Sequence, residues 1–186
     1  MTAPANPAPL RADAQRNLGR VLEAAAEVFA EQGPDATVDE IARRAGVGHG
    51  TVFRRFPTKE ALVAAVIAKQ FRELAEEAEA FDDDEAGVAF ERFVWHMADL
   101  YTRNRALFEG LPMCGEIPDV IEAKGRLNEV VRRLVVRAQG EGSLRNDVEP
   151  EDVPMLVGSA IHASGYASAP EAWRRYVAVV LAGLRP

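Results

Sequence analysis

Several polar and charged residues between positions 37 and 59 have side chains that recognise other molecules by hydrogen bonding and charge. His49 can donate or accept a hydrogen bond through its ring, and Thr51 can donate one through its hydroxyl. Arg54 and Arg55 follow in the same segment and carry fixed positive charge. Such groups donate to phosphate oxygens and to the edges of nucleic-acid bases. The chemistry predicted for this segment is therefore recognition of an anionic partner, in which no covalent bond is made or broken.

Two short helices separated by a glycine turn would hold these side chains in place. Thr37 and Glu40 have the spacing of a capping box, in which hydroxyl and carboxylate accept hydrogen bonds from free amides at a helix start. Gly46 suits the left-handed position that ends a helix, and Gly48 is an acceptable N-cap for a second helix ending near residue 55. Pro57 ends that helix, because the residue before a proline avoids helical geometry. The pattern predicts a helix-turn-helix, whose second helix enters the major groove of DNA.

The second of these helices has distinct faces. Val52 and Phe56 are four residues apart and are expected to point together into the core. His49 and Phe53 share another face, which starts at the end of the helix where side chains reach base edges. His49 is therefore the predicted base-reading residue; the alternatives are that it touches only phosphate or nothing.

Other residues of the segment are predicted to contact phosphates or to permit close approach of the DNA. Gly50 has no side chain, which would let the backbone come near the duplex; the alternative is a tight contact between helices. Thr37, at a helix start, can present its hydroxyl and amide to a phosphate. Arginine pairs are often merely solvated, but the pairs that adjoin this motif are predicted to contact phosphate: Arg43 with Arg44, and Arg54 with Arg55.

The stretch from residue 16 to residue 62 resembles the DNA-binding domain of the TetR (tetracycline-repressor) family of bacterial regulators. The resemblance is carried by residues 25–33, Thr37, Val38, Ile41, Ala42, residues 45–47, residues 50–53 and residues 56–62. Residues 142–153 and 173–176 are compatible with the same family. The resemblance implies that Lys59 binds phosphate. The full set predicted to bind DNA is Thr37, Arg43, Arg44, Gly48, His49, Gly50, Thr51, Phe53, Arg54, Arg55 and Lys59.

Two residues depart from the family pattern. Gly48 stands where serine or threonine is usual, and Phe53 stands where tyrosine is usual. Both missing hydroxyls commonly meet phosphate, and the loss of each is expected to weaken binding by ~1 kcal/mol. Arg55 stands where histidine is frequent and is a candidate to compensate for the lost phosphate contacts. Because Gly48 has no side chain to read a base, base reading is expected to shift onto His49.

Length and charge limit the class of protein. The chain has 186 residues, 48% of them hydrophobic, enough for a sizeable core in one domain or two small ones. Its net charge of -7 is unevenly spread: lysine and arginine number 9 against 8 acids up to residue 70, and 13 against 21 thereafter. Eight of those later acids lie between residues 73 and 85. The acidity therefore spares the part that is predicted to bind DNA.

The sequence carries no targeting feature. The one cysteine, Cys114, allows no intrachain disulfide and fits a reducing compartment. The first nine residues lack the basic start and apolar run of a signal peptide. No stretch approaches the ~20 apolar residues of a membrane span. We therefore expect a cytoplasmic protein without a membrane partner, in which residues 1–11 form a disordered arm.

Helical periodicity runs through almost the whole chain, without an alternating strand pattern of useful length or an internal repeat. The predicted fold class is all-α with about nine helices. Apart from the two reading helices, these cover residues 12–32, 58–80, 85–103, 105–110, 119–139, 150–167 and 170–184. Residues 12–57 are expected to form the helix-turn-helix DNA-binding domain, and residues 58–186 a helical effector-binding and dimerisation domain.

The family resemblance further implies a homodimer. In the family, the last two helices form a four-helix interface with the same pair of a second subunit, and reading a palindrome requires such a two-fold partner. The candidate interface residues are Val157, Ile161, Gly165, Val177, Val180 and Leu181. The alternative is that these residues fill the core of the monomer.

A small-molecule effector is implied in the same way. By resemblance, a small, largely apolar molecule binds in the C-terminal body, shifts the fourth helix and releases the DNA. The candidate lining residues are Phe93, Trp95, His96, Met97, Tyr101, Phe108, Met113, Cys114, His162 and Tyr166, with plain core packing as the alternative for each. A redox role for Cys114 is a further alternative, although a lone cysteine is more often a small buried hydrophobe.

Two other classes of protein fit the sequence less well. The three histidines have no metal-ligand spacing, no serine sits in a nucleophile elbow, and the glycines near Gly48 lack the strand and the Gly-Lys-Ser/Thr of a phosphate loop. We therefore expect no enzyme, no metal and no cofactor. A helical ligand-binding or scaffold protein with weak or lost DNA binding stays open because of Gly48 and Phe53. The favoured interpretation is a sequence-specific DNA-binding transcriptional regulator, with repression as the family default.

Overall fold

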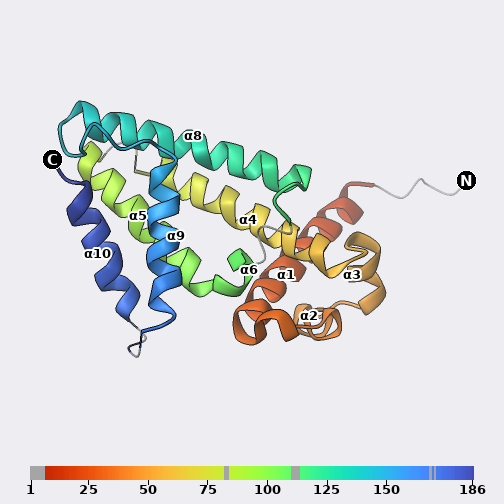
Figure 1. The fold of residues 1–186 in the computed structure, drawn as a ribbon. Coiled ribbons are helices and arrows are strands. Elements are labelled where there is room, and N and C mark those ends of the chain that lie inside the picture. The colour runs from red at the N-terminus through yellow and green to blue at the C-terminus, as the bar shows by residue number, and fades with distance from the viewer. Residues whose placement is uncertain (1–6, 82–83, 110–113, 168, 170) are drawn as a thin grey trace, which may run out of the picture.

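The computed structural model of the chain describes residues 7–81, 84–109, 114–167, 169 and 171–186. Within these ranges the regular structure is entirely helical, with nine α-helices and one 3₁₀ turn, Gly33–Asp35. This confirms the predicted all-α class. Figure 1 shows a small helical head at one end of the molecule and a larger helical body at the other.

The head consists of α1 (Pro7–Gln32), α2 (Val38–Ala45) and α3 (His49–Arg55). Each of these helices buries one apolar face, and the three faces meet in the core of the head. Val28 on α1, Ile41 on α2 and Val52 on α3 are among the buried side chains. The first helix begins at Pro7, five residues earlier than expected. Residues 7–11 of the expected arm are therefore helical, and residues 1–6 lie outside the described part of the chain.

The body is built on α4 (Lys59–Glu79) and α8 (Pro118–Gly140), the two helices that pack most extensively on each other. They lie side by side along the length of the molecule (Figure 1). The body also contains α5 (Ala86–Arg103), α6 (Arg105–Glu109), α9 (Asp152–Ser164) and α10 (Ala172–Leu184). Because α4 follows α3 after only three residues and then runs through the body, it connects the two parts mechanically.

Local signals explain some of the helix ends. The Thr58 hydroxyl accepts a hydrogen bond from the Ala61 amide at 3.1 Å and so caps α4. After α8, Gly142 takes a left-handed φ of 72°, which lets the chain turn back. Arg145 then donates from its backbone amide to the Leu184 carbonyl at 3.0 Å, which fixes this loop against the end of α10. The last two helices are shorter than predicted: α9 spans Asp152–Ser164 where 150–167 was expected, and α10 spans Ala172–Leu184 where 170–184 was expected.

One continuous hydrophobic core runs from the head into the body. Phe71, Phe93 and Met97 are among its largest fully buried side chains. Among the described residues, none of the helices combines the length and the apolar content needed to cross a lipid bilayer.

Candidate nucleic-acid interface and ligand cavity

The left-handed turn between α2 and α3 is present as predicted, but of the capping box before it only the Thr37 half is formed, since the Glu40 carboxylate accepts from Arg43. The Thr37 hydroxyl accepts a hydrogen bond from the Glu40 amide at 3.3 Å and caps α2. Gly46 ends that helix with φ 65° and ψ 35°, a left-handed conformation that favours glycine. Gly48 is the extended N-cap of α3. These short-range features fix the direction in which α3 leaves the turn.

One face of α3 is anchored in the head and the other faces solvent. Val52 is 1% exposed and Phe56, just after the helix, is also buried, as predicted. Phe53, by contrast, is 52% exposed. The remaining predicted residues of this surface are exposed as well, and they are Gly48, His49, Gly50, Thr51, Arg54 and Arg55. This outer surface of α3 is therefore free to meet a partner.

His49 is held in place by two neighbours. Its Nδ1 lies 2.5 Å from the Asp39 carboxylate on α2, and its ring stacks on Phe53 with centroids 5.7 Å apart. Because Nδ1 is engaged by Asp39, Nε2 is the ring nitrogen that can reach a base. Sequence analysis did not single out Asp39. An acid in the first turn of a helix has an ordinary role beside the helix dipole, so its sequence position gives no sign of this contact.

The basic residues around α3 differ in what holds them. Arg43 is exposed and pairs with Glu40 at 3.0 Å, one turn earlier on α2. Arg54 donates from Nε to the Gly50 carbonyl at 3.0 Å, which keeps its guanidinium along the outer surface of α3. Lys59 lies at the start of α4 with its ammonium 5.8 Å from the centre of the Phe29 ring. Arg43, Arg54, Arg55 and Lys59 thus place positive charge on α3 and on the helices directly before and after it.

Arg44 has a different environment from the one expected. Both of its terminal nitrogens donate to the Glu31 carboxylate at 2.7 Å, and Glu27 lies 3.6 Å away. The hydrogen bonds from Arg44 hold the pKa of Glu31 below its ordinary value. This bidentate pair joins α2 to α1. We therefore assign Arg44 to positioning the reading unit within the head, in place of the phosphate contact predicted for it.

Gly50 is not required by packing. A Cβ atom built on this residue would have nothing within 4 Å. The alternative considered for it, a tight contact between helices, is therefore excluded.

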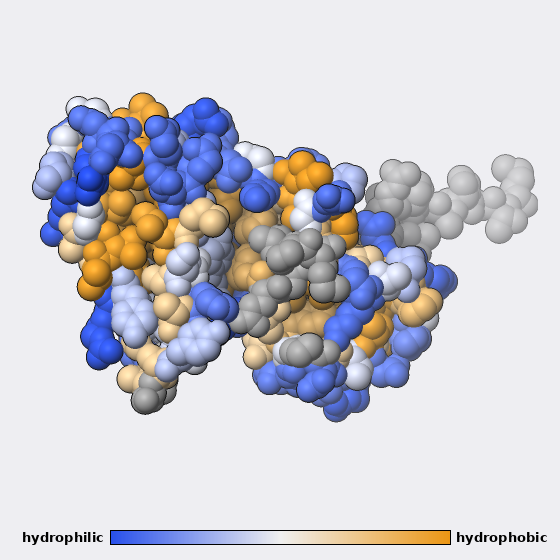
Figure 2. Space-filling view, viewed as in Figure 1, coloured by the Kyte–Doolittle hydropathy of each residue, from blue (hydrophilic) through white to orange (hydrophobic). Residues whose placement is uncertain are grey.

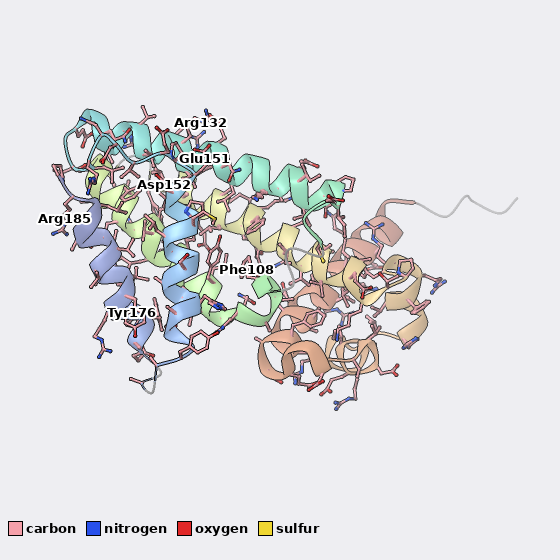
Figure 3. All side chains as sticks on the ribbon, in the orientation of Figure 1. Phe108, Arg132, Glu151, Asp152, Tyr176 and Arg185 are labelled. Atoms are coloured by element: carbon pink, nitrogen blue, oxygen red, sulfur yellow. The ribbon has the colours of Figure 1, made fainter. Side chains whose placement is uncertain are left out.

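The body contains a cavity of about 620 Å³ between α4, α5, α6, α8 and α9. Its floor is apolar, with Phe71, Leu127 and Val131 among the lining residues. Polar side chains lie around it, and they are Arg105, Lys124, Asn128, Glu151 and His162. Phe108 projects from α6 at one end of the cavity, and Glu151 lies at the start of α9 at the other (Figure 3). Four of the predicted effector-binding residues line this cavity: Met97, Tyr101, Phe108 and His162.

Tyr101 and Gly158 form one wall of this cavity. Burial raises the pKa of Tyr101 to about 12, so its phenol stays neutral at any physiological pH. A Cβ on Gly158 would lie 3.6 Å from the Tyr101 ring, which is an ordinary van der Waals distance. Gly158 was not among the predicted residues, because a glycine in an apolar helix carries no sign of the cavity beside it.

The other predicted effector-binding residues lie elsewhere. Phe93 is in the core, and Trp95 and His96 line a second cavity between α1, α4, α5 and α10. Tyr166 is exposed on the surface beside His162, and Met113 lies outside the described residues. Cys114 is buried with its Sγ 3.7 Å from the Glu60 carbonyl. Burial, with a smaller contribution from the Glu60 charge, raises the pKa of the Cys114 thiol, which disfavours the reactive thiolate.

The predicted interface residues mostly face inward. Val157, Ile161, Val177 and Leu181 are buried within the single chain, and Val180 is partly buried. A Cβ on Gly165 would overlap the Arg105 side chain, so this glycine accommodates a neighbour within the chain. In this conformation a second copy could contact few of these side chains. The exposed large apolar residues of the same two helices are Met155, Leu156 and Val179.

No group of three or more histidine, cysteine, aspartate or glutamate side chains in the described ranges is placed to hold a metal ion. Both candidate sites are therefore made of hydrogen-bonding, charged and apolar groups. The first is an exposed surface with basic side chains, and the second is a partly open and largely apolar cavity. The two are joined by α4.

Comparison with known families gives two matches. The bacterial regulatory proteins of the tetR family match residues 21–66. The C-terminal domain of SbtR-like transcriptional regulators matches residues 85–186, more than half of the chain. SrpR, a helix-turn-helix transcriptional regulator of Pseudomonas putida, is 30% identical over 142 residues, which are 72% of this chain and 66% of SrpR. Other curated regulators match over 48 to 67 residues, and this chain spans 26% to 45% of their length.

Solved structures give the same result over nearly the whole chain. A TetR transcription regulatory protein from Mycobacterium vanbaalenii is 36% identical, with a TM-score of 0.72 and coverage of 96% of this chain and 100% of that one. The TetR regulator SCO0520 from Streptomyces coelicolor is 26% identical, with a TM-score of 0.71 and coverage of 90% and 98%. The similarity thus extends through both the head and the body.

Proposed function

We propose, from the premise that this chain belongs to the TetR family of bacterial regulatory proteins, that it is a homodimeric repressor released from a palindromic operator by a small, largely apolar effector. The chain is a transcriptional regulator with a helix-turn-helix DNA-binding domain, and it is not an enzyme. The observation that carries the proposal is the solvent-facing surface of α3, which presents His49 and Gly50 between basic side chains and is not required for packing.

The proposed contacts divide by their chemistry. His49 reads a base edge through Nε2, while Arg43, Arg54, Arg55 and Lys59 donate to phosphates on either side. The Thr37 hydroxyl already accepts the Glu40 amide, but its own hydrogen can still be donated to a phosphate. Thr51 is exposed on α3 and is proposed to donate in the same way.

A dimer through the outer faces of α9 and α10 is supported by exposed apolar residues there. Val179 on α10 lies beside the small exposed residues Ala178 and Ala182, which would let a second helix approach closely. On α9, Leu156 is a further exposed apolar residue; Met155 is exposed as well but lines the effector cavity. Figure 2 shows hydrophobic residues gathered over this side of the body, which contains α10. Exposed apolar surface of this kind typically marks a contact with another protein.

The effector is proposed to act through α4. Phe71 on this helix lines the cavity, and Thr58 caps the same helix directly after the reading unit. A molecule that binds better when α4 has moved shifts the equilibrium towards that position. A coupling of ~1–3 kcal/mol between effector and DNA would give useful switching.

We expect operator affinity to fall steeply with salt, because cationic side chains that bind DNA phosphates displace counterions. If the four basic residues around α3 each neutralise one phosphate, the log–log slope is about -7 for a dimer, at about -0.9 per phosphate. The measurement is a gel-shift series in potassium chloride, on genomic fragments that the purified protein selects. A flat response would instead support the alternative, a helical ligand-binding or scaffold protein with weak or lost DNA binding.

Filling the cavity is expected to block ligand binding without affecting the DNA-binding surface. Gly158→Leu places a large side chain against Tyr101 and should weaken binding of the apolar fluorescent probe anilinonaphthalene sulfonate by about tenfold. The matched control is Gly158→Ala, whose methyl lies at an ordinary contact distance of 3.6 Å from that ring. Equal probe binding by both variants would show that the probe does not bind in this cavity, and would contradict its assignment as the effector site.

A further inference from the structure

The second cavity, of about 840 Å³, lies between the head and the body and is separate from the proposed effector cavity. Its walls come from α1, α4, α5 and the start of α10. The lining residues are Ala26, Glu27 and Ala30 on α1, four residues of α4, five residues of α5 with Asn104 directly after it, and Trp173 and Arg174 on α10. We call it the junction groove, because an occupant would touch both the DNA-binding head and the body.

A buried amide in the lining of the junction groove has an unused acceptor. Asn104 donates from Nδ2 to the Leu100 carbonyl at 3.0 Å, so its Oδ1 must accept. Gln70 supplies the donor, from Nε2 at 2.8 Å, and this fixes which end of the Gln70 amide faces Asn104. Gln70 Oε1 is consequently left without a hydrogen-bond partner among the described residues, although Gln70 is only 7% exposed. A buried acceptor in this state favours a ligand that donates hydrogen bonds.

The same groove is lined with carboxylates. Glu27, Glu73, Glu77 and Asp99 all belong to it, against the basic residues His96, Arg103 and Arg174. The carboxylates are paired with basic side chains: Glu73 with Lys69 at 2.5 Å, Glu77 with His96 at 3.1 Å, Asp99 with Arg103 at 2.8 Å and Glu27 with Arg44 at 3.6 Å. These ion pairs are largely exposed, and exposed pairs are individually weak. A soluble cation can therefore compete for the carboxylates.

Two tryptophans complete the wall. Trp95 and Trp173 meet edge to face, with ring centroids 6.2 Å apart. The guanidinium of Arg174 already lies 4.4 Å from the Trp173 ring, as expected for an aromatic face that attracts positive charge. The acceptor at Gln70, the carboxylates and the indole rings all favour the same kind of ligand.

We propose that the junction groove binds a small organic ammonium ion with several N–H donors, of the primary diamine class. One ammonium group donates to Gln70 Oε1 and the other engages the carboxylates, with the alkyl chain against the indole rings. Because the bound diamine touches α1 as well as α5 and α10, it restrains the head relative to the body. This site is independent of the effector cavity, and its occupation does not require that the protein bind DNA.

Intrinsic fluorescence gives a direct test, because Trp95 and Trp173 are the only tryptophans of the chain and both line the groove. The full-length protein is titrated with 1,6-diaminohexane in the absence of DNA, at constant ionic strength. A saturable change in emission is expected. The neutral analogue 1,6-hexanediol should give none, and an equal response to the diol would overturn the proposal.

Three variants assign the response to the groove. Glu77→Gln combined with Asp99→Asn is expected to weaken diamine binding roughly fivefold, since two exposed charge contacts are lost. The matched control, Glu122→Gln combined with Glu129→Gln on α8, removes the same charge outside the groove and should bind normally. Gln70→Met should weaken binding about tenfold through loss of the buried acceptor. The unfolding temperature of Gln70→Met is measured in parallel. If this variant does not fold, the comparison of the carboxylate variant with its α8 control decides the result.

The two cavities are distinguished by Gly158→Leu, which fills the effector cavity and should leave the diamine titration unchanged. Loss of the response in this variant would place the diamine in the effector cavity and overturn the junction site. Equal affinities in the carboxylate variant and in its α8 control would also overturn it, since the response would then be due to net charge alone.

Discussion

Gly50→Leu is expected to weaken operator binding about a hundredfold, as a side chain forced into a packed interface costs about 3 kcal/mol. The free protein has open space at this position, with nothing within 4 Å of a Cβ. The same space would be occupied by the duplex if the backbone of α3 approaches it closely. The measurement is a titration of labelled operator at fixed salt, because affinities for DNA depend strongly on ionic strength.

The same substitution should stabilise the head. Glycine within a helix costs roughly 0.5–1 kcal/mol relative to a residue with a side chain, and Gly50 lies within the first turn of α3. The unfolding temperature of Gly50→Leu is therefore expected to rise while its affinity for DNA falls. Opposite signs in the two measurements separate a lost DNA contact from a damaged fold.

Gly125→Leu is the matched control. Gly125 lies within α8, is exposed, and also has nothing within 4 Å of a built Cβ. It should show the same gain in stability with unchanged operator affinity. If Gly50→Leu also kept wild-type affinity, the N-terminal part of α3 would not face the duplex, and the assignment of His49 as base reader would be lost with it.

The reading unit could be predicted from the sequence because short-range interactions determine it. The Thr37 cap, the left-handed Gly46 and the spacing of Val52 and Phe56 each depend on residues within one or two helical turns. The contact of Asp39 with His49 joins two helices that cross, and the sequence does not give the crossing angle. For the same reason the sequence could not show that Arg44 pairs with Glu31 on α1.

The ligand cavity was harder to predict because periodicity identifies an apolar face but not what that face meets. Phe93 and Met97 belong to the same stripe of α5, yet Phe93 fills the core while Met97 reaches the cavity. On the last two helices, the strongly apolar positions proved to be the inner ones. An interface that is made of small residues and a few exposed apolar ones leaves a much weaker pattern in the sequence.

The largest effect on DNA binding is expected from Val179→Asp, which places a charge in the centre of the proposed dimer interface. Val179 is 70% exposed, so the substitution leaves the core of the protomer intact. A buried, unpaired carboxylate at a subunit interface is strongly unfavourable. Analytical ultracentrifugation at micromolar concentration should therefore show the mass of a single chain. The far-UV circular dichroism spectrum should be unchanged.

Loss of the dimer removes the second binding event from each operator. In the dimer, the second head binds its half-site as an intramolecular step, which typically raises affinity by ~10²–10⁴. Val179→Asp is therefore expected to bind a two-half-site operator at least about a hundredfold more weakly, while its affinity for an isolated half-site stays the same. Val136→Asp, at a valine of α8 that is 59% exposed, is the control and should remain dimeric with full affinity. A dimeric Val179→Asp protein would exclude this face of α10 as the interface, and a monomeric one with full operator affinity would show that two-fold pairing is not what reads the DNA.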